Sequence, residues 1–180
     1  MKQLFLLFPM VACCYTTHAQ QHSYLGSKVN GNFNGDGKIA QATVVKTKEG
    51  QGNPVEDGTP DEYEIRFPGT GLSPIAAGCC TVRLVNEGDL DGDGADELSL
   101  FQAPMNGCTY SMKTYTLKQG KWQLLVPTFL IPTACEPLSD TKLRQRIFAE
   151  QGNIYYLETD INDKHGKLTK RKVATRQIKK

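Results

Sequence analysis

The chain has 180 residues, 22% of them charged and 39% hydrophobic, and a formal net charge of +2. This length is enough for one domain with a buried core. After the N-terminal segment no run of residues is apolar and long enough to span a bilayer, so no transmembrane helix is expected there.

The first nineteen residues have the layout of a secretory signal peptide. Lys2 supplies a positive charge, the run 4–14 is apolar, and Thr17 and Ala19 place small residues before a cleavage point. Cleavage after Ala19 leaves the segment 20–180, which we expect to form a single β domain.

A second processing route is open at Cys13. The preceding Met-Val-Ala resembles a lipoprotein box, in which Cys13 would become the lipidated first residue. Either route takes the chain out of the cytoplasm. The predicted location is therefore periplasmic or secreted, as in bacterial export, with a lipoprotein anchored through Cys13 as the alternative.

Alternation of polar and apolar residues predicts an all-β fold class. Tyr63, Ile65 and Phe67, for example, lie on one face of an extended segment. The best helix candidate, 139–146, is short. The predicted strands are 39–47, 62–67, 81–85, 97–101, 110–117, 121–126 and 153–159, with a weaker candidate at 168–178.

Turn signals divide these strands. The segments 117–122 and 149–154 each carry Gln-Gly between apolar residues, which predicts two tight hairpins because glycine adopts a positive φ. The polar segment 51–61 contains two prolines and is predicted to be a loop inside the domain.

The chain contains an internal repeat. Residues 31–45 align with residues 88–101 at an offset of 57, and in both copies a polar ladder leads directly into a strand. Such repeats indicate stacked units such as propeller blades, but the segment 20–180 holds fewer than three of them, and propellers have at least about four blades. We therefore expect a small propeller-like or irregular antiparallel sheet assembly.

Four cysteines follow the signal segment, at positions 79, 80, 108 and 135. An even number in an exported chain predicts disulfides, and four cysteines allow three pairings. A bond between the neighbours Cys79 and Cys80 would be strained, so each is expected to reach Cys108 or Cys135. A zinc site is disfavoured because spaced pairs and histidine partners are missing.

The strongest motif is the acidic segment 89–97. Asp89, Asp91 and Asp93 occupy alternate positions, so their oxygens converge when the backbone curls around one point, and Gly94 permits the sharp turn. Carboxylates this close repel one another, which favours binding of a cation. Calcium suits the set, because it takes six to eight hard oxygen ligands.

The motif is not an EF-hand, because Leu100 stands where that loop has its bidentate glutamate. An acid at position 9, Glu97, followed directly by a strand resembles the FG-GAP or VCBS-type repeats of β-propellers. The resemblance covers two segments of the chain. It implies calcium coordination by Asp89, Asp91, Asp93, the Ala95 carbonyl and Glu97, with Asp96 pointing away or binding indirectly.

The first copy departs from this pattern. Asn32, Asn34 and Asp36 fill the alternate positions and Lys38 offers a backbone carbonyl, but Ala40 replaces the closing carboxylate. Because affinity falls with the charge of the ligands, this second site is expected to bind calcium weakly or not at all.

Charge is unevenly distributed along the chain. The segment 21–163 contains nineteen acids and twelve bases, whereas 164–180 contains eight bases and no acid. We interpret this basic C-terminal segment as a solvated edge strand, with contact to an acidic partner or a membrane surface as the alternative. Aromatic residues are not interleaved with the bases, so a nucleic-acid partner is not expected.

No motif for catalysis is present. The two histidines after the signal segment, His22 and His165, stand near opposite ends, and no nucleophile elbow, HExxH or P-loop occurs. The predicted function is a non-catalytic, calcium-stabilised binding module for a protein or glycan outside the cytoplasm. The alternatives are an exported inhibitor or immunity protein against a cell-wall-degrading enzyme, and a hydrolase that uses paired carboxylates.

Overall fold

The computed structural model describes residues 25–163 and 165–174. The predicted signal peptide, the alternative lipidation site at Cys13, His22 and the end of the basic segment lie outside the described residues. The elements are β1 (Leu25–Gly26), β2 (Lys28–Gly31), β3 (Ala40–Lys48), β4 (Glu62–Arg66), β5 (Ile75–Cys79), β6 (Val82–Gly88), β7 (Glu97–Gln102), β8 (Thr109–Lys118), β9 (Lys121–Pro132), α1 (Asp140–Arg144), β10 (Ile147–Glu150), β11 (Asn153–Thr159) and β12 (Leu168–Lys172).

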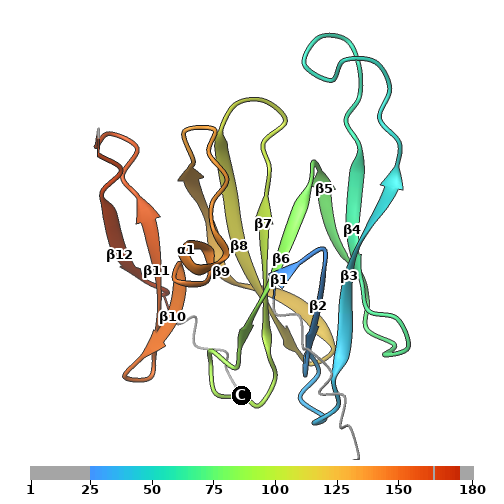
Figure 1. The fold of residues 1–180 in the computed structure, drawn as a ribbon. Helices are drawn as coiled ribbons and strands as arrows, with labels where there is room; N and C mark the ends of the chain where they lie inside the picture. Colours follow the sequence, from blue (N-terminus) through green and yellow to red (C-terminus); the bar gives the residue numbers. More distant parts are fainter. Residues whose placement is uncertain (1–24, 164, 175–180) are drawn as a thin grey trace, which may run out of the picture.

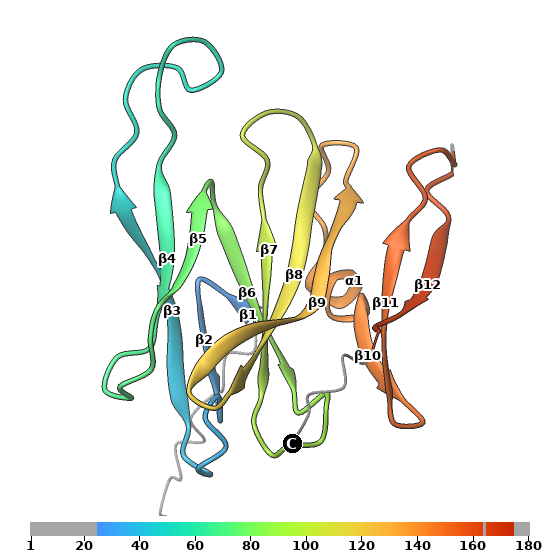
Figure 2. The same ribbon diagram turned by 180° about the vertical axis from the view of Figure 1, so that it is seen from behind.

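The described strands form three antiparallel sheets, which confirms the all-β fold class. Their strand orders are β2-β3-β4-β5, β1-β6-β7-β8-β9 and β10-β11-β12, and they lie side by side with α1 between the second and third (Figures 1 and 2). Sequential strands are neighbours throughout the four-stranded runs β2–β5 and β6–β9. Each run is an up-and-down meander, the unit from which propeller blades are built.

The sequence repeat matches these two meanders. In the first, Gly31 pairs with Ala40 where β2 and β3 enclose a loop, and in the second Gly88 pairs with Glu97 where β6 and β7 enclose the acidic loop. Both copies therefore occupy the first turn of a four-stranded unit. The third sheet has three strands and no comparable loop among its described residues.

Two hydrophobic clusters cover opposite faces of the middle sheet. Val82 and Leu84 of β6 point into the cluster shared with β2–β5, whereas the adjacent Val85 points into the cluster shared with α1 and the third sheet. This alternation is the period of two expected of a strand that is buried on both faces. Ile65 and Phe67 are buried in the first cluster, as their alternation predicts.

Both predicted hairpins are confirmed. Gln119 and Gly120 join β8 to β9, Gln151 and Gly152 join β10 to β11, and all four have a positive φ between 50° and 73°. Two successive positive φ values are typical of the turn that follows the twist of a two-residue hairpin. The short helix is also confirmed, and the Ser139 side chain caps it by accepting the Lys142 N–H.

The prediction about the cysteines is wrong. Among the described cysteines Cys108 is bonded to Cys135, whereas Cys79 and Cys80 are free. The reason is topological: β5 ends in the first sheet, whereas Cys108 and Cys135 flank the β8–β9 hairpin, at 4.8 Å between their Cα atoms. The weaker candidate strand at 168–178 is confirmed in its first part, because β12 covers Leu168–Lys172, and residues 175–178 lie outside the described part.

The ranges 25–163 and 165–174 contain no helix with the length and apolarity needed to cross a membrane. The disulfide is consistent with an oxidising compartment, where such bonds persist.

Candidate metal centre

The acidic loop joins β6 to β7 and is organised around the Asp89 carboxylate. Asp89 Oδ1 accepts the backbone N–H groups of Gly92 at 2.7 Å and Asp93 at 3.1 Å, and Oδ2 accepts that of Gly94 at 3.0 Å. Gly92 and Gly94 have φ values of 76° and 90°, which side-chain-bearing residues rarely adopt. The loop therefore curls because its own amides wrap around its first carboxylate.

Three acidic side chains of this loop converge. Asp89, Asp91 and Glu97 each present one oxygen, and these oxygens lie within 4.8 Å of one another. Glu97 is fully buried and its Oε2 accepts the Leu90 N–H at 2.6 Å. The other Glu97 oxygen, Oε1, and Asp91 Oδ1 are buried without a hydrogen-bond partner among the described residues. Unsatisfied buried carboxylate oxygens are rare, so this pair requires an explanation.

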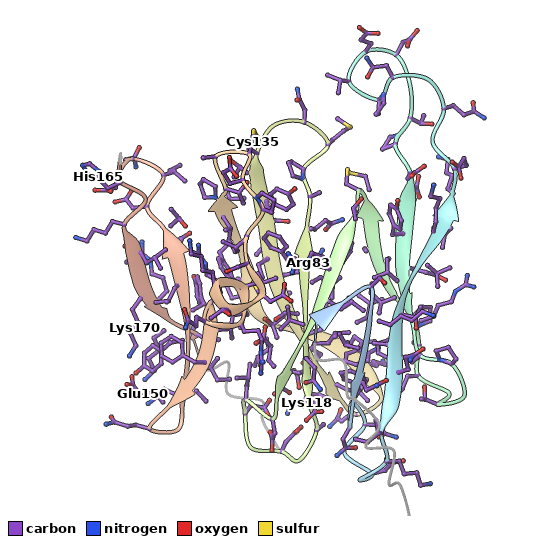
Figure 3. The ribbon with its side chains drawn as sticks, in the orientation of Figure 1. Arg83, Lys118, Cys135, Glu150, His165 and Lys170 are labelled. Carbon is purple, nitrogen blue, oxygen red and sulfur yellow. A yellow bond between two sulfur atoms is a disulfide. The ribbon has the colours of Figure 1, made fainter. Side chains whose placement is uncertain are left out.

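A basic side chain faces the same loop from another strand. Lys118, the last residue of β8, places its Nζ 2.7 Å from Asp91 Oδ2 and also pairs with Asp93 Oδ2. Figure 3 shows Lys118 at the end of the middle sheet where the β6–β7 loop lies. Sequence reasoning missed this residue, although in an antiparallel meander the end of β8 must lie beside the start of β7.

The other residues predicted as ligands lie around this centre. Asp93 forms an ion pair with Lys118, and its Oδ1 accepts the Ala95 N–H at 2.9 Å. It is not one of the three convergent acids. Asp96 faces away, toward the first repeat, where its Oδ2 accepts the Asn32 N–H at 2.9 Å. The structure thus brings three of the four predicted carboxylates together.

The electrostatics of the loop favour a cation. Burial raises the pKa of Glu97 to about 7, and the nearby Asp91 and Asp93 add to this effect. Burial also raises the pKa of Glu87, at the end of β6, to about 8. Burial acts against the charged form of Lys118, but its hydrogen bonds to Asp91 and Asp93 outweigh this and raise its pKa. A cation bound beside Glu97 would offset the repulsion from Asp91 and Asp93 and favour its charged form.

The loop of the first repeat has the same conformation. Gly35 and Gly37 have φ values of 71° and 77°, at the positions of the two loop glycines of the second repeat. Asn32 Oδ1 accepts the Gly37 N–H at 3.1 Å, and Asp36 Oδ1 accepts the Lys38 N–H at 2.8 Å. The two loops therefore share hydrogen bonds to the backbone as well as residue types.

The two loops differ in the oxygens that remain available. In the first, Asn34 Oδ1 accepts the Asp36 N–H at 3.3 Å, and Ala40 offers no side-chain oxygen at the closing position. Asp36 is the only carboxylate among the predicted ligands of the first loop. Because this loop is exposed, burial has little effect on the pKa of Asp36. No convergent acidic group is found among its described residues.

The second loop fits a hard cation such as calcium. Asp89 Oδ2 accepts one hydrogen bond and retains a lone pair, and Asp91 Oδ1 and Glu97 Oε1 accept none. Carboxylate oxygens in a flexible loop are ligands that calcium prefers. Lys118 supplies positive charge at the same place, so a cation and this ammonium group would compete for Asp91.

Comparisons of the chain with protein-family models, with curated proteins and with solved structures found no match. The resemblance of the loops to a known repeat family therefore stays a prediction from the sequence motif.

Proposed function

We propose that this protein is an exported, calcium-stabilised binding module without catalytic activity, and that its repeats are of the FG-GAP or VCBS type. The observation that carries the proposal is the convergence of Asp89, Asp91 and Glu97, with two buried oxygens that accept no hydrogen bond. Calcium bound there would satisfy these oxygens and hold the start of β7 against the end of β6.

The role of the ion in this proposal is structural. The loop connects two central strands of the middle sheet, and Glu97 is both the first residue of β7 and a proposed ligand. Extracellular modules bind calcium with dissociation constants of about 10⁻⁴–10⁻³ M, which matches the concentration outside cells. The proposed location is the periplasm or the exterior, and the partner is a protein or glycan found there.

The test is a calcium titration followed by thermal unfolding. With a dissociation constant of about 1 mM, 10 mM calcium should stabilise the fold by about 1.4 kcal/mol. Asp91→Asn keeps the shape of the side chain but removes charge, and it should abolish this shift. Asp36→Asn makes the same change in the first loop and should leave the shift intact.

The outcomes separate the proposal from a simple charge effect. Magnesium at the same concentration should stabilise the wild type much less, because it demands near-ideal octahedral geometry. A melting temperature that is the same in EDTA and in calcium would overturn the proposal. Binding to purified envelope glycans and envelope proteins, measured with and without calcium, then identifies the kind of partner.

A further inference from the structure

A cavity lies away from the acidic loop. It has a volume of about 650 Å³ and is enclosed by the end of β9, by α1 and by strands β11 and β12 with the turn between them. Figure 3 shows Cys135 and His165, which belong to the segments around this cavity, at the end of the sheets opposite Lys118. This volume is within the range of about 300–1,000 Å³ of small-molecule sites.

A buried guanidinium lines this cavity. Arg146 is only 7% exposed, and its Nη1 donates to Leu157 O at 3.0 Å and to Thr159 Oγ1 at 3.1 Å. Nε and Nη2 have no hydrogen-bond partner among the described residues, yet they are not among the side-chain atoms sealed from solvent. Arg146 itself is one of the residues that line the cavity.

Arg146 has no carboxylate partner in the described part of the chain. Charged residues are almost never buried unless they are paired. Burial lowers the pKa of Arg146, because no carboxylate partner offsets the cost of burying its positive charge. An anion in the cavity would supply it, and the planar guanidinium matches a carboxylate with two parallel hydrogen bonds.

The other residues of the lining indicate which chemical groups the anion has besides its charge. Most of the lining area is apolar, and a ligand must bury an apolar body against it. The apolar side chains of the lining are Pro132, Pro137, Leu138, Leu157, Ile161 and Leu168.

The acids of the lining limit the charge of the ligand. Asp160 Oδ1 accepts the Asn162 N–H at 2.9 Å, and Asp163 Oδ1 accepts the His165 N–H at 2.9 Å, so both are used by their own turn. Glu136 is exposed at the rim. These three acids outnumber the two bases of the lining, Arg146 and Lys142, so the cavity disfavours a dianion such as phosphate more strongly than a monoanion.

The rim is held in an unusual backbone conformation. Ala134 and Cys135 have φ values of 50° and 65°, and neither is glycine. A residue with a Cβ is strained in this conformation, and this kind of strain concentrates at ligand sites. The Cys108–Cys135 disulfide and the hydrogen bond from Thr133 N–H to Cys108 O at 2.9 Å fix this segment.

From these observations we propose that the cavity is a binding site for small monocarboxylates with an apolar body, with Arg146 as the residue that binds the carboxylate. The site goes beyond the calcium-loop proposal and does not depend on it, because none of the residues in the acidic loop lines the cavity.

The probe is octanoate, with 1-octanol as the uncharged control of the same chain length. Titration of the full protein, followed by ¹H–¹⁵N NMR, should show saturable octanoate binding with shifts at Arg146, Leu157 and Thr159. Octanol should bind at least tenfold more weakly. Equal binding of the two probes, or no shifts at these residues, would overturn the proposal without any variant.

Variants then test whether the charge of Arg146 and the wall of the cavity are needed for octanoate binding. Arg146→Lys keeps a positive charge but loses the planar fork, and it should weaken octanoate binding at least fivefold.

Because Arg146 also supports the fold, a second variant uses Leu168, which is 44% exposed on the cavity wall. Leu168→Asp should abolish octanoate binding, whereas Leu168→Asn should reduce it only slightly. Leu124→Asp, an equally exposed position outside the cavity, should change nothing. Unchanged octanoate binding by Leu168→Asp contradicts the assignment.

Discussion

Asn32 and Asp96 hold the two repeats together through a pair of hydrogen bonds. The Asn32 N–H donates to Asp96 Oδ2 at 2.9 Å, and the Asp96 N–H donates to Asn32 O at 2.9 Å. The first residue of one polar loop is thereby fixed to the last turn of the other. This contact connects the acidic loop directly to the residue that follows β2 in the first sheet.

Gly31 lies directly beside this contact and leads to a stability prediction. A Cβ at this position would lie 2.6 Å from Asn86 Nδ2 and 2.8 Å from Asp96 Oδ2. Gly31→Ala should therefore lower the free energy of unfolding by about 1–3 kcal/mol, because the packed side chains must shift. Denaturant unfolding can be followed by the fluorescence of Trp122. Lys28→Ala, an exposed change on the same strand, is the control, and equal midpoints for both variants would contradict the prediction.

Lys118 should act as an internal cation for the loop. Lys118→Met removes the ammonium group from Asp91 and Asp93, so the calcium-free protein should lose about 1 kcal/mol of stability. The same change removes a competitor for Asp91, so the calcium-induced shift in melting temperature should become larger. Lys121→Met, on the other side of the same hairpin turn, should change neither value. A smaller calcium shift in Lys118→Met would contradict the competition.

The sequence predicts strands where the apolar residues alternate, as at Tyr63, Ile65 and Phe67. It does not predict β5, whose Ala-Ala-Gly centre has little strand preference, because that strand forms by pairing with β4. The loops were predictable because their ligand pattern and glycines are local in sequence. Their conformation follows from hydrogen bonds over five residues or fewer.

The residues that sequence reasoning missed act over longer distances. Lys118 is separated from Asp93 by 25 residues, and their contact depends on the register of β7 and β8. Arg146 lies near a predicted helix end, and nothing local indicates that its guanidinium is buried without an acid. The pairing of Cys108 with Cys135 depends in the same way on the length of the β8–β9 hairpin.

The cysteines offer a chemical test of the fold. Peptide mapping without reduction should recover Cys108 linked to Cys135 and should find Cys79 and Cys80 as thiols. Burial raises the pKa of Cys80 to about 11, and its neighbour Cys79 adds to this effect. Since the thiolate is the reactive form, alkylation of Cys80 in Cys79→Ser should be slow at pH 8 and should accelerate about tenfold per pH unit up to pH 10. A rate that levels off below pH 9 would contradict this pKa, and Cys80→Ser is the matched control.

Asp61 should make stability depend on pH. Its pKa is lowered first by the hydrogen bond from Lys46 and then by that from the Gly50 N–H at 2.8 Å. The unfolded chain therefore binds a proton more readily than the folded one does. The stabilisation is present above the ordinary aspartate pKa of about 3.9 and is lost as the pH falls through the lower folded value.

Asp61→Asn should accordingly melt below the wild type at pH 7, and the difference should narrow toward pH 3. The measurement is the melting temperature at a series of pH values. Glu56→Gln, in the same loop and exposed, serves as the control and should follow the wild type. A difference between Asp61→Asn and the wild type that stays constant over this range would show that the contact is not ionic.

The strand β9 takes part in both hydrophobic clusters. Near its start Trp122 stacks on Phe67 at 4.9 Å between ring centroids, and near its end Phe129 packs on Tyr156 at 4.8 Å. Figure 2 shows this strand curving across the middle of the molecule. Because one continuous segment is buried in two cores, we expect the two cores to unfold together. The fluorescence of the single tryptophan should then report on the unfolding of all three sheets, and not only of the sheet that it contacts.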